Sequence, residues 1–425
     1  MKKLLCVVAV LCSQYLYAQK TILYCGKLVD PKNLAVLTEM SIIVDGSTIS
    51  SVEKGYVKAS AGDKIIHLEK QTVMPGLIDC HVHLETSIGP DDFVNQFKFN
   101  PQDIAFLSIG YADSTLMAGF TTVRDLGGSG VNISLRNAIN KGLVPGPRVF
   151  TAGVALGSTG GHGDPTNGLR SDLMGNPGPV DGVVNGVDDC IRAVRIRYKQ
   201  GSDVIKIMST GGVLSLEKDG LGAQLTDDEI KAIVTTAKDY GLRVACHAHG
   251  PEGIKRAIRN GVNSIEHGTF MDDECIALFK QYGTYYVPTV IAGKSVSDSA
   301  KMPGFFPPVI AGKALMVGPK IQNTFAKAYK AGVKIAFGTD AGVYAHGKNW
   351  MEFVYMTEAG MPILEAIRAA TVSASDLIGI SDKVGTIEAG KFADIIAVDG
   401  DPQTDAHVMG KVSFVMKGGV VYKQR

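Results

Sequence analysis

Between residues 75 and 374, short apolar segments alternate along the chain with amphipathic helical stretches. This alternation is typical of parallel βα units, in which each helix covers the strand before it. The candidate strands end near His83, Arg124, Thr151, Lys206, His247, Glu266, Val290 and Asp340. Eight such units fit a (β/α)8 TIM-type barrel, which typically needs about 250 residues. We therefore predict an α/β fold with this barrel at residues 75–374.

The two ends of the chain have a different character. Residues 20–74 contain short strand-like runs such as Thr21–Tyr24 and Ser41–Val44, separated by turns. Residues 375–425 contain similar runs, for example Ala393–Val398 and Val412–Met416. We expect both ends to fold together into a small β-sandwich domain.

Residues 1–19 have the three regions of a secretory signal peptide. Met1-Lys2-Lys3 is basic, Leu4–Cys12 is apolar, and a small residue follows at Ala18. Nine apolar residues are too few to span a bilayer as a helix. We expect an exported protein, periplasmic or secreted, without stable membrane association. An uncleaved anchor or a first core strand is the alternative.

Composition excludes some partners. The formal net charge is +1 and no long basic run occurs, so the electrostatic footprint of a nucleic-acid-binding protein is absent from the sequence. A small-molecule partner is favoured, and we expect a homo-oligomer. Outside the signal, Cys25, Cys80, Cys190, Cys246 and Cys275 are scattered, which does not indicate a disulfide framework.

Two histidines stand one residue apart at the end of the first candidate strand. Because side chains alternate along a strand, His81 and His83 face the same side, while Val82 faces the packing. This spacing suits one metal ion. The alternative is a pair of polar residues that hydrogen-bond to backbone.

Further reactive residues fall at the ends of later candidate strands, the edge at which barrel enzymes hold their active sites. Lys206 interrupts an apolar strand, where an ammonium is costly unless it is paired or neutral. It is either a partner in a structural ion pair or a lysine that has reacted with CO2 to give a carbamate, an anionic ligand able to bridge two metals. His247, His249 and His267 follow, and Asp340 ends the last strand, where an isolated aspartate would usually cap a helix.

Taken in order, these motifs resemble the amidohydrolase superfamily, in the branch related to imidazolonepropionases and metal-dependent Xaa-Pro and Xaa-Arg dipeptidases. The resemblance spans the mature chain and includes the trailing Gly390, Lys391 and Phe392-Ala393-Asp394. Imidazolonepropionases themselves resemble it less, because they bind one metal, lack the strand lysine and carry His-Ala-Asp-Glu where this chain has His247-Ala248-His249-Gly250.

The resemblance implies two divalent metal ions. His81, His83 and Asp340 would hold one ion, His247 and His267 the other, and carbamylated Lys206 would bridge them. Nitrogen and oxygen ligands favour zinc, with manganese, cobalt or iron as alternatives. Asp340 would be the catalytic residue, accepting a proton from the attacking water and passing it to the leaving amine.

Two more histidines are expected to bind substrate. His162 lies in the glycine-rich stretch Gly157–Asp164, which lacks the Gly-Lys-Ser/Thr ending of a phosphate loop. The resemblance places a similar histidine in this loop, and it places a carboxylate-binding tyrosine where this chain has His249. His346 follows Asp340 on a loop, and we assign it no role.

The resemblance therefore implies an exported hydrolase of the amide bond to a C-terminal amino acid, either dipeptidase-like or acting on N-acyl amino acids. A cyclic amidohydrolase or deaminase of the imidazolonepropionase type is one alternative. A catalytically inactive structural relative is another, which the loss of a ligand would mark.

Overall fold

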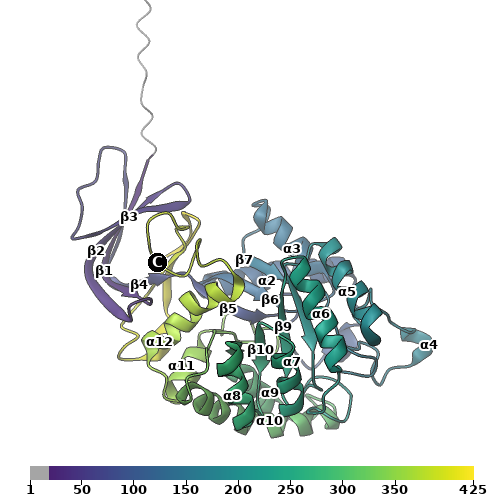
Figure 1. Cartoon of the computed structure of the whole chain (residues 1–425). Coiled ribbons are helices and arrows are strands. Elements are labelled where there is room, and N and C mark those ends of the chain that lie inside the picture. Colours follow the sequence, from purple (N-terminus) through teal and green to yellow (C-terminus); the bar gives the residue numbers. More distant parts are fainter. Residues whose placement is uncertain (1–18) are drawn as a thin grey trace, which may run out of the picture.

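The computed structural model describes residues 19–425 and contains three β-sheets with helices around two of them (Figure 1). The predicted signal peptide, apart from Gln19, lies outside the described residues. None of the described helices is both long and apolar enough to cross a membrane.

The middle of the chain forms two parallel sheets whose strand order follows the sequence. One contains β5 (Leu77–Val82), β6 (Phe120–Asp125) and β7 (Arg148–Thr151). The other contains β8 (Val204–Met208), β9 (Arg243–Ala248), β10 (Ser264–His267) and β11 (Tyr285–Val287). A single parallel bridge between Leu156 and Ile207 connects them. The predicted α/β class with parallel strands is confirmed.

The segment 335–341, where an eighth strand was expected, is not a regular strand. It nevertheless forms parallel bridges at both sides, from Ile335 to Tyr286 and from Ala341 to Val82. The Cys80 amide also donates to the Phe337 carbonyl at 2.9 Å. The segment thus connects the last parallel strand to the first.

The predicted end of the seventh strand near Val290 is wrong by three residues. β11 ends at Val287, and helix α9 begins at Val290. Thr289 between them has a left-handed backbone with φ 50°, which ends the extended conformation.

Helices connect the parallel strands and cover their outer side (Figure 1). The predicted capping box is confirmed: Thr226 accepts a hydrogen bond from the Glu229 amide and opens α6. The helices are α1 (Asp92–Asn95), α2 (Pro101–Met117), α3 (Val131–Asn140), α4 (Ser171–Met174), α5 (Gly186–Gln200), α6 (Asp227–Asp239), α7 (Pro251–Arg259), α8 (Asp273–Tyr282), α9 (Val290–Ala300), α10 (Pro308–Lys330), α11 (Met351–Glu358), α12 (Ile363–Arg368) and α13 (Ala374–Ile378).

The third sheet has seven strands and draws on both ends of the chain. Its order is β14 (Val420–Gln424), β13 (Val412–Lys417), β12 (Ile395–Val398), β4 (Lys64–Pro75), β1 (Thr21–Asp30), β2 (Ala35–Asp45) and β3 (Thr48–Lys54). Only β1 and β4 pair in parallel. A sandwich was expected here, whereas the structure has one sheet.

The two faces of this sheet contribute to two different hydrophobic clusters. One face supplies a hydrophobic cluster that includes Leu23, Ile42, Val73 and Phe414, and all members of that cluster lie in or beside the sheet. The sheet must therefore curl for these side chains to meet. Alternate residues such as Met74 and Ile396 pack into the main core with the parallel strands.

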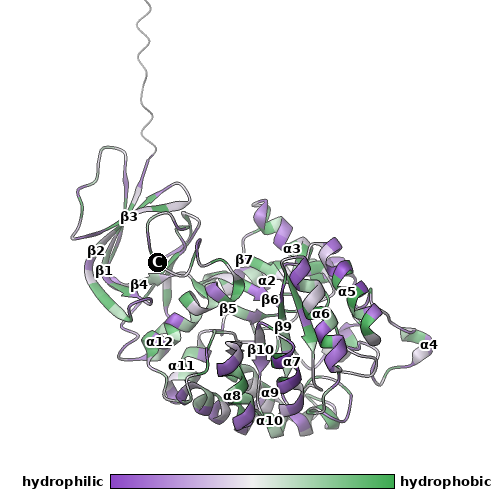
Figure 2. Cartoon of the chain, viewed as in Figure 1, coloured by the Kyte–Doolittle hydropathy of each residue, from purple (hydrophilic) through white to green (hydrophobic). Residues whose placement is uncertain are grey.

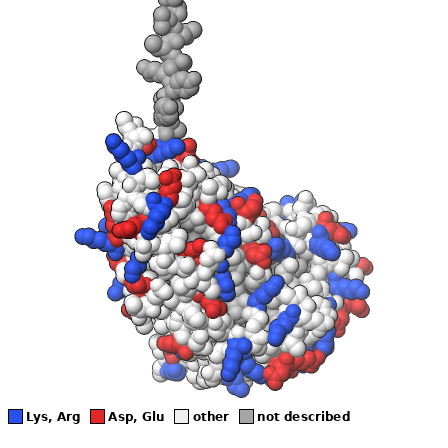
Figure 3. Space-filling view, turned by 60° about the vertical axis from the view of Figure 1, so that its left-hand side comes forward, with Lys and Arg blue, Asp and Glu red and all other residues white. Residues whose placement is uncertain are grey.

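Hydrophobic strands lie inside the helical layer, whereas many helices carry hydrophilic residues on their outer surface (Figure 2). On the face drawn in Figure 3, Lys and Arg are interspersed with Asp and Glu. Cys25, Cys80, Cys190, Cys246 and Cys275 are buried and free, as expected from their scattered positions.

Candidate active site

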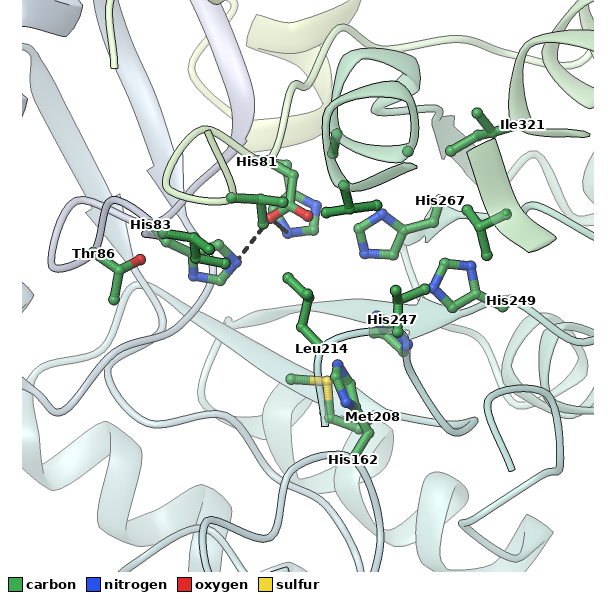
Figure 4. A pocket seen from close by; sticks show the side chains of 18 of the residues that line it. His81, His83, Thr86, His162, Met208, Leu214, His247, His249, His267 and Ile321 are labelled. Atoms are coloured by element: carbon green, nitrogen blue, oxygen red, sulfur yellow. Dashed lines mark ion pairs between the residues drawn. The ribbon is translucent and has the colours of Figure 1, made fainter. Parts of the chain in front are cut away.

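A cavity of about 210 Å³ opens at the carboxyl ends of the parallel strands, and it brings all eight sequence-predicted site residues together (Figure 4). These residues are His81, His83, His162, Lys206, His247, His249, His267 and Asp340. They come from segments up to 259 positions apart (340 − 81), so only the fold can assemble them.

The first histidine pair meets the last aspartate. The Nε2 atoms of His81 and His83 lie 3.4 Å and 3.1 Å from the Asp340 Oδ1 atom. His267 joins this group, since one ligand atom each of His81, His267 and Asp340 lie within 4.8 Å of one another. Such a group of buried nitrogen and oxygen donors can hold a metal ion.

Three of these histidines have a fixed ring orientation, because the Nδ1 atom is hydrogen-bonded on the side away from the cavity. His81 Nδ1 lies 3.0 Å from Glu266 Oε2, and His83 Nδ1 lies 2.8 Å from the Gly127 carbonyl. His267 Nδ1 lies 2.7 Å from Thr289 Oγ1. Their Nε2 atoms remain available for metal binding, which is the usual arrangement of metal-binding histidines.

His247 is oriented the other way round. Its Nε2 atom lies 3.2 Å from the Gly211 carbonyl, so Nδ1 is the nitrogen left for a ligand. Its ring centroid is 4.8 Å from that of His267. The two residues assigned to a second ion are therefore adjacent.

The imidazoles of His162 and His249 both pack against that of His247. The His162 ring centroid is 4.4 Å and the His249 centroid 4.8 Å from that of His247. Ser215 Oγ lies 2.6 Å from His162 Nδ1, and Thr269 Oγ1 lies 2.9 Å from His249 Nδ1. Both rings are thus held in place by hydroxyl groups.

Except at His83, where Asp340 and other neighbours raise the pKa, burial favours the neutral form of these imidazoles. It lowers the pKa of His81 to about 4, with the charge of Lys206 acting in the same direction. It also lowers the pKa of His162 to about 3 and that of His249 to about 3. Neutral imidazole is the form that binds a metal ion.

Lys206 lies on β8 with 2 % of its surface exposed and lines the cavity. Burial lowers the pKa of its ammonium group, and the charges of Glu266 and Asp340 only partly oppose this. Among the ion pairs of the described residues, none involves Lys206. The structure therefore gives this buried lysine no carboxylate partner, which leaves the structural ion pair without support.

Two of the candidate ligands have a strained backbone. His267 and Asp340 are left-handed, with φ 68° and 61°. This conformation is uncommon in residues other than glycine, and it persists where the surrounding structure enforces it, often at functional sites. His267 is the last residue of β10, so this left-handed backbone stands at the carboxyl end of that strand.

Sequence reasoning missed the groups that support the ligands. Glu266 is fully buried and connects His81 to Arg124, whose Nη2 lies 2.9 Å from Glu266 Oε1. Burial raises the pKa of Glu266, but the Arg124 charge, the hydrogen bond with His81 and the Lys206 charge together outweigh it and lower that pKa to about 2. The signal was present, because Arg124 and Glu266 are charged residues in otherwise apolar strands.

Asp79 plays a comparable part beneath Asp340. It is fully buried and accepts hydrogen bonds from the amides of His81 and Thr339 and from the Asn349 side chain. It thereby ties β5 to the segment that ends at Asp340. His346 does not line the cavity; it lies 2.8 Å from the Thr86 carbonyl and stacks on Tyr111.

Comparison with known proteins identifies relatives along nearly the whole chain. Residues 72–422 match the model of the amidohydrolase family. The fold is similar to a crystal structure of a Xaa-Pro dipeptidase with methionine bound in the active site, at 50 % identity and a TM-score of 0.93, covering 95 % of this chain and 100 % of that one.

Two further relatives are more distant. A prolidase in complex with N-methylphosphonate-L-proline is 33 % identical with a TM-score of 0.87, covering 96 % of this chain and 100 % of that one. Ochratoxinase from Aspergillus niger is 32 % identical over 435 residues, covering 96 % of this chain and 87 % of the relative.

Proposed function

The chain belongs to the amidohydrolase family and is a hydrolase of carbon–nitrogen bonds, and we propose that it uses two metal ions to cleave the amide bond to a C-terminal amino acid. The observation that carries this proposal is the gathering of all six candidate ligands, with two further histidines, around one cavity. The geometry leaves no candidate ligand outside the site, which argues against an inactive relative.

The donor set fits two divalent ions. His81, His83 and Asp340 would hold one ion, and His247 and His267 the other, with Lys206 as a carbamate between them. The lack of a carboxylate partner and the lowered pKa of Lys206 support the carbamate, because the neutral amine is the form that reacts with CO2. Nitrogen and oxygen donors in a site open to the cavity favour zinc.

When bound, the ions would polarise the scissile carbonyl and make a water nucleophile available near neutral pH. The chain's own residues move the proton. Although burial opposes it, the neighbouring imidazoles lower the pKa of Asp340, so its carboxylate is ionised and can accept a proton. From the cavity wall Asp340 would pass that proton to the leaving amine.

His162 and His249 would bind the substrate carboxylate. Both line the cavity beside the second ion's ligands, and their Nδ1 atoms lie next to hydroxyl groups. Burial is the main cause of the lowered pKa of both rings. The positive charge of the nearby Lys313 ammonium lowers that pKa further and favours a bound anion. Methionine in the related Xaa-Pro dipeptidase is a free amino acid with such a carboxylate.

The range of relatives favours broad amide specificity over strict Xaa-Pro cleavage. One is a Xaa-Pro dipeptidase, one a prolidase and one an ochratoxinase. We further propose that β5–β11 and the segment 335–341 close into the eight-membered barrel, and that the protein is exported after loss of residues 1–19.

Amidation of the substrate tests this proposal. Dipeptides with a free C-terminal carboxylate should lose most of their kcat/KM when that carboxylate is amidated, and His249→Ala should erase much of the difference. A charge-assisted hydrogen bond is commonly worth about 1.5–3 kcal/mol, which corresponds to roughly 10- to 160-fold in kcat/KM. Equal turnover of free-acid and amidated dipeptides would overturn the proposed substrate class, as would efficient hydrolysis of cyclic imides or imidazolones instead.

A further inference from the structure

One wall of the cavity consists of aliphatic side chains and backbone from two consecutive helices. α9 contributes Ala292, Gly293 and Val296, and α10 contributes Val317 and Ile321. Val296, Val317 and Ile321 are 4 %, 3 % and 1 % exposed. We call these five residues the α9–α10 wall.

The wall lies on the same side of the cavity as His249, one of the two histidines to which we assign the substrate carboxylate. In Figure 4, Ile321 lies on the same side of the cavity as His249 and His267, whereas His83 and Thr86 lie on the opposite side. In an amino acid, the side chain and the carboxylate are bonded to the same α-carbon. A carboxylate held at His249 therefore places the side chain of that residue against the α9–α10 wall.

The described cavity offers no counter-charge for a basic side chain. Its only charged lining residues are Lys206 and Asp340, both part of the candidate metal site. Glu217 is nearby, but its Oε1 accepts hydrogen bonds from Ser215 Oγ at 2.6 Å and from the Gly212 amide at 3.0 Å. Its Oε2 is buried and has no hydrogen-bond partner in the described structure, but Glu217 does not line the cavity, and the Lys313 ammonium 3.9 Å from Oε1 partly balances its charge. An arginine or lysine side chain would lose its hydration without gaining a partner.

Close packing between α9 and α10 prevents the wall from moving away from a bound side chain. A Cβ atom at Gly293 would lie 2.8 Å from Ile321 Cγ2, and one at Gly318 would lie 2.3 Å from Ser297 Cβ. The two helices therefore approach as closely as glycine allows. The start of α9 is also held by Glu352, which accepts hydrogen bonds from the Val290 and Ile291 amides at 2.9 Å and 2.7 Å.

We propose that the α9–α10 wall selects substrates whose C-terminal residue has an apolar side chain, with Ile321 as a specificity-determining residue. This inference rests on the proposed function and adds the class of the residue that is released. Acidic side chains are excluded for the same reason as basic ones, since the wall offers neither a charge nor a hydrogen-bond donor from a side chain.

A panel of dipeptides with a common N-terminal alanine tests the inference on the native enzyme. Ala-Leu and Ala-Met should exceed Ala-Lys, Ala-Arg and Ala-Asp by about 100-fold or more in kcat/KM. Free L-leucine and L-methionine should inhibit competitively at lower concentrations than free L-lysine and L-arginine.

Ile321→Ala should change the preference, because it enlarges the space beside His249. The ratio of kcat/KM for Ala-Phe to that for Ala-Leu should rise about 10-fold. Ile310→Ala is the matched control, since Ile310 is a 7 % exposed residue of the same helix that does not line the cavity. It should leave the ratio unchanged.

The outcomes separate the two proposals. Hydrolysis of Ala-Lys or Ala-Arg as fast as Ala-Leu, together with equal inhibition by the free amino acids, overturns the inference and leaves the proposed function standing. Turnover of none of these dipeptides or of their N-acyl counterparts overturns both. If Ile321→Ala does not fold, the inhibition by free amino acids on the native enzyme still decides.

Discussion

Each candidate ligand histidine points one nitrogen at the cavity because its other nitrogen is already hydrogen-bonded. Glu266 does this for His81, the Gly127 carbonyl for His83, the Gly211 carbonyl for His247 and Thr289 for His267. Fixing the tautomer and the ring in advance lowers the cost of binding an ion. The His247 ring presents a different nitrogen from the other three, which no spacing in the sequence could indicate.

Replacement of the strand lysine tests the bridging role. Lys206→Ala should lose metal and most of its activity, because each of the two proposed ions would lose an anionic ligand in a site otherwise rich in imidazole. Metal content by elemental analysis and turnover of a dipeptide are the measurements. Added short carboxylic acids should partly restore activity by occupying the space of the carbamate.

Lys238→Ala is the matched control, since Lys238 is an exposed residue in the last turn of α6. It should keep both metal and activity. A fully active Lys206→Ala protein with two bound ions would show that the lysine is not a bridging ligand.

Residue types at strand ends predicted seven of the side chains that line the cavity, because parallel strands present their carboxyl ends at one edge; His162 came from the glycine-rich loop, and the apolar lining was not predicted. The supporting groups were not predicted. Arg124 and Glu266 meet across strands β6 and β10, and Asp79 meets Asn349 from 270 positions away. Such pairs depend on how the strands are placed around the cavity, and a single sequence does not contain that information.

At the scale of elements, the segment 335–341 is where the structure departs from the expected strand. Gly338 explains its close approach to β5. A Cβ atom at that position would lie 2.3 Å from Val287 Cγ1 and 3.1 Å from His81 Cβ. The glycine allows the segment to pass between β11 and β5 and to place Asp340 beside His81 and His83.

Gly338→Ala should therefore destabilise the protein and weaken the candidate metal site together. Overpacking of a core typically costs about 1–3 kcal/mol, and here the displaced neighbours include His81. A lower Tm and a lower metal affinity in the same variant are the expected results. An unchanged Tm and metal affinity would show that the segment is not held tightly against β5.

Gly312→Ala provides the contrast for this variant. Gly312 lies in the exposed part of α10, and a Cβ there would meet nothing within 4 Å. Alanine is favoured over glycine in a helix by up to about 1 kcal/mol, so this protein should be as stable as the native one or slightly more so.

At the scale of the whole molecule, both chain ends contribute strands to one sheet, because β4 pairs with β1 on one side and with β12 on the other. Strand patterns at the two ends predicted that they would meet. They could not distinguish a sandwich from one curled sheet, since alternate burial along a strand is the same in both. Export and a homo-oligomeric state remain predictions.

Metal stoichiometry tests the central claim most directly. Elemental analysis of the purified, fully active protein should find two divalent ions per chain, and activity should fall in step as a chelator removes them. The six candidate ligands around one cavity account for this number. Full activity with a single ion per chain, or with none, would contradict a binuclear amidohydrolase.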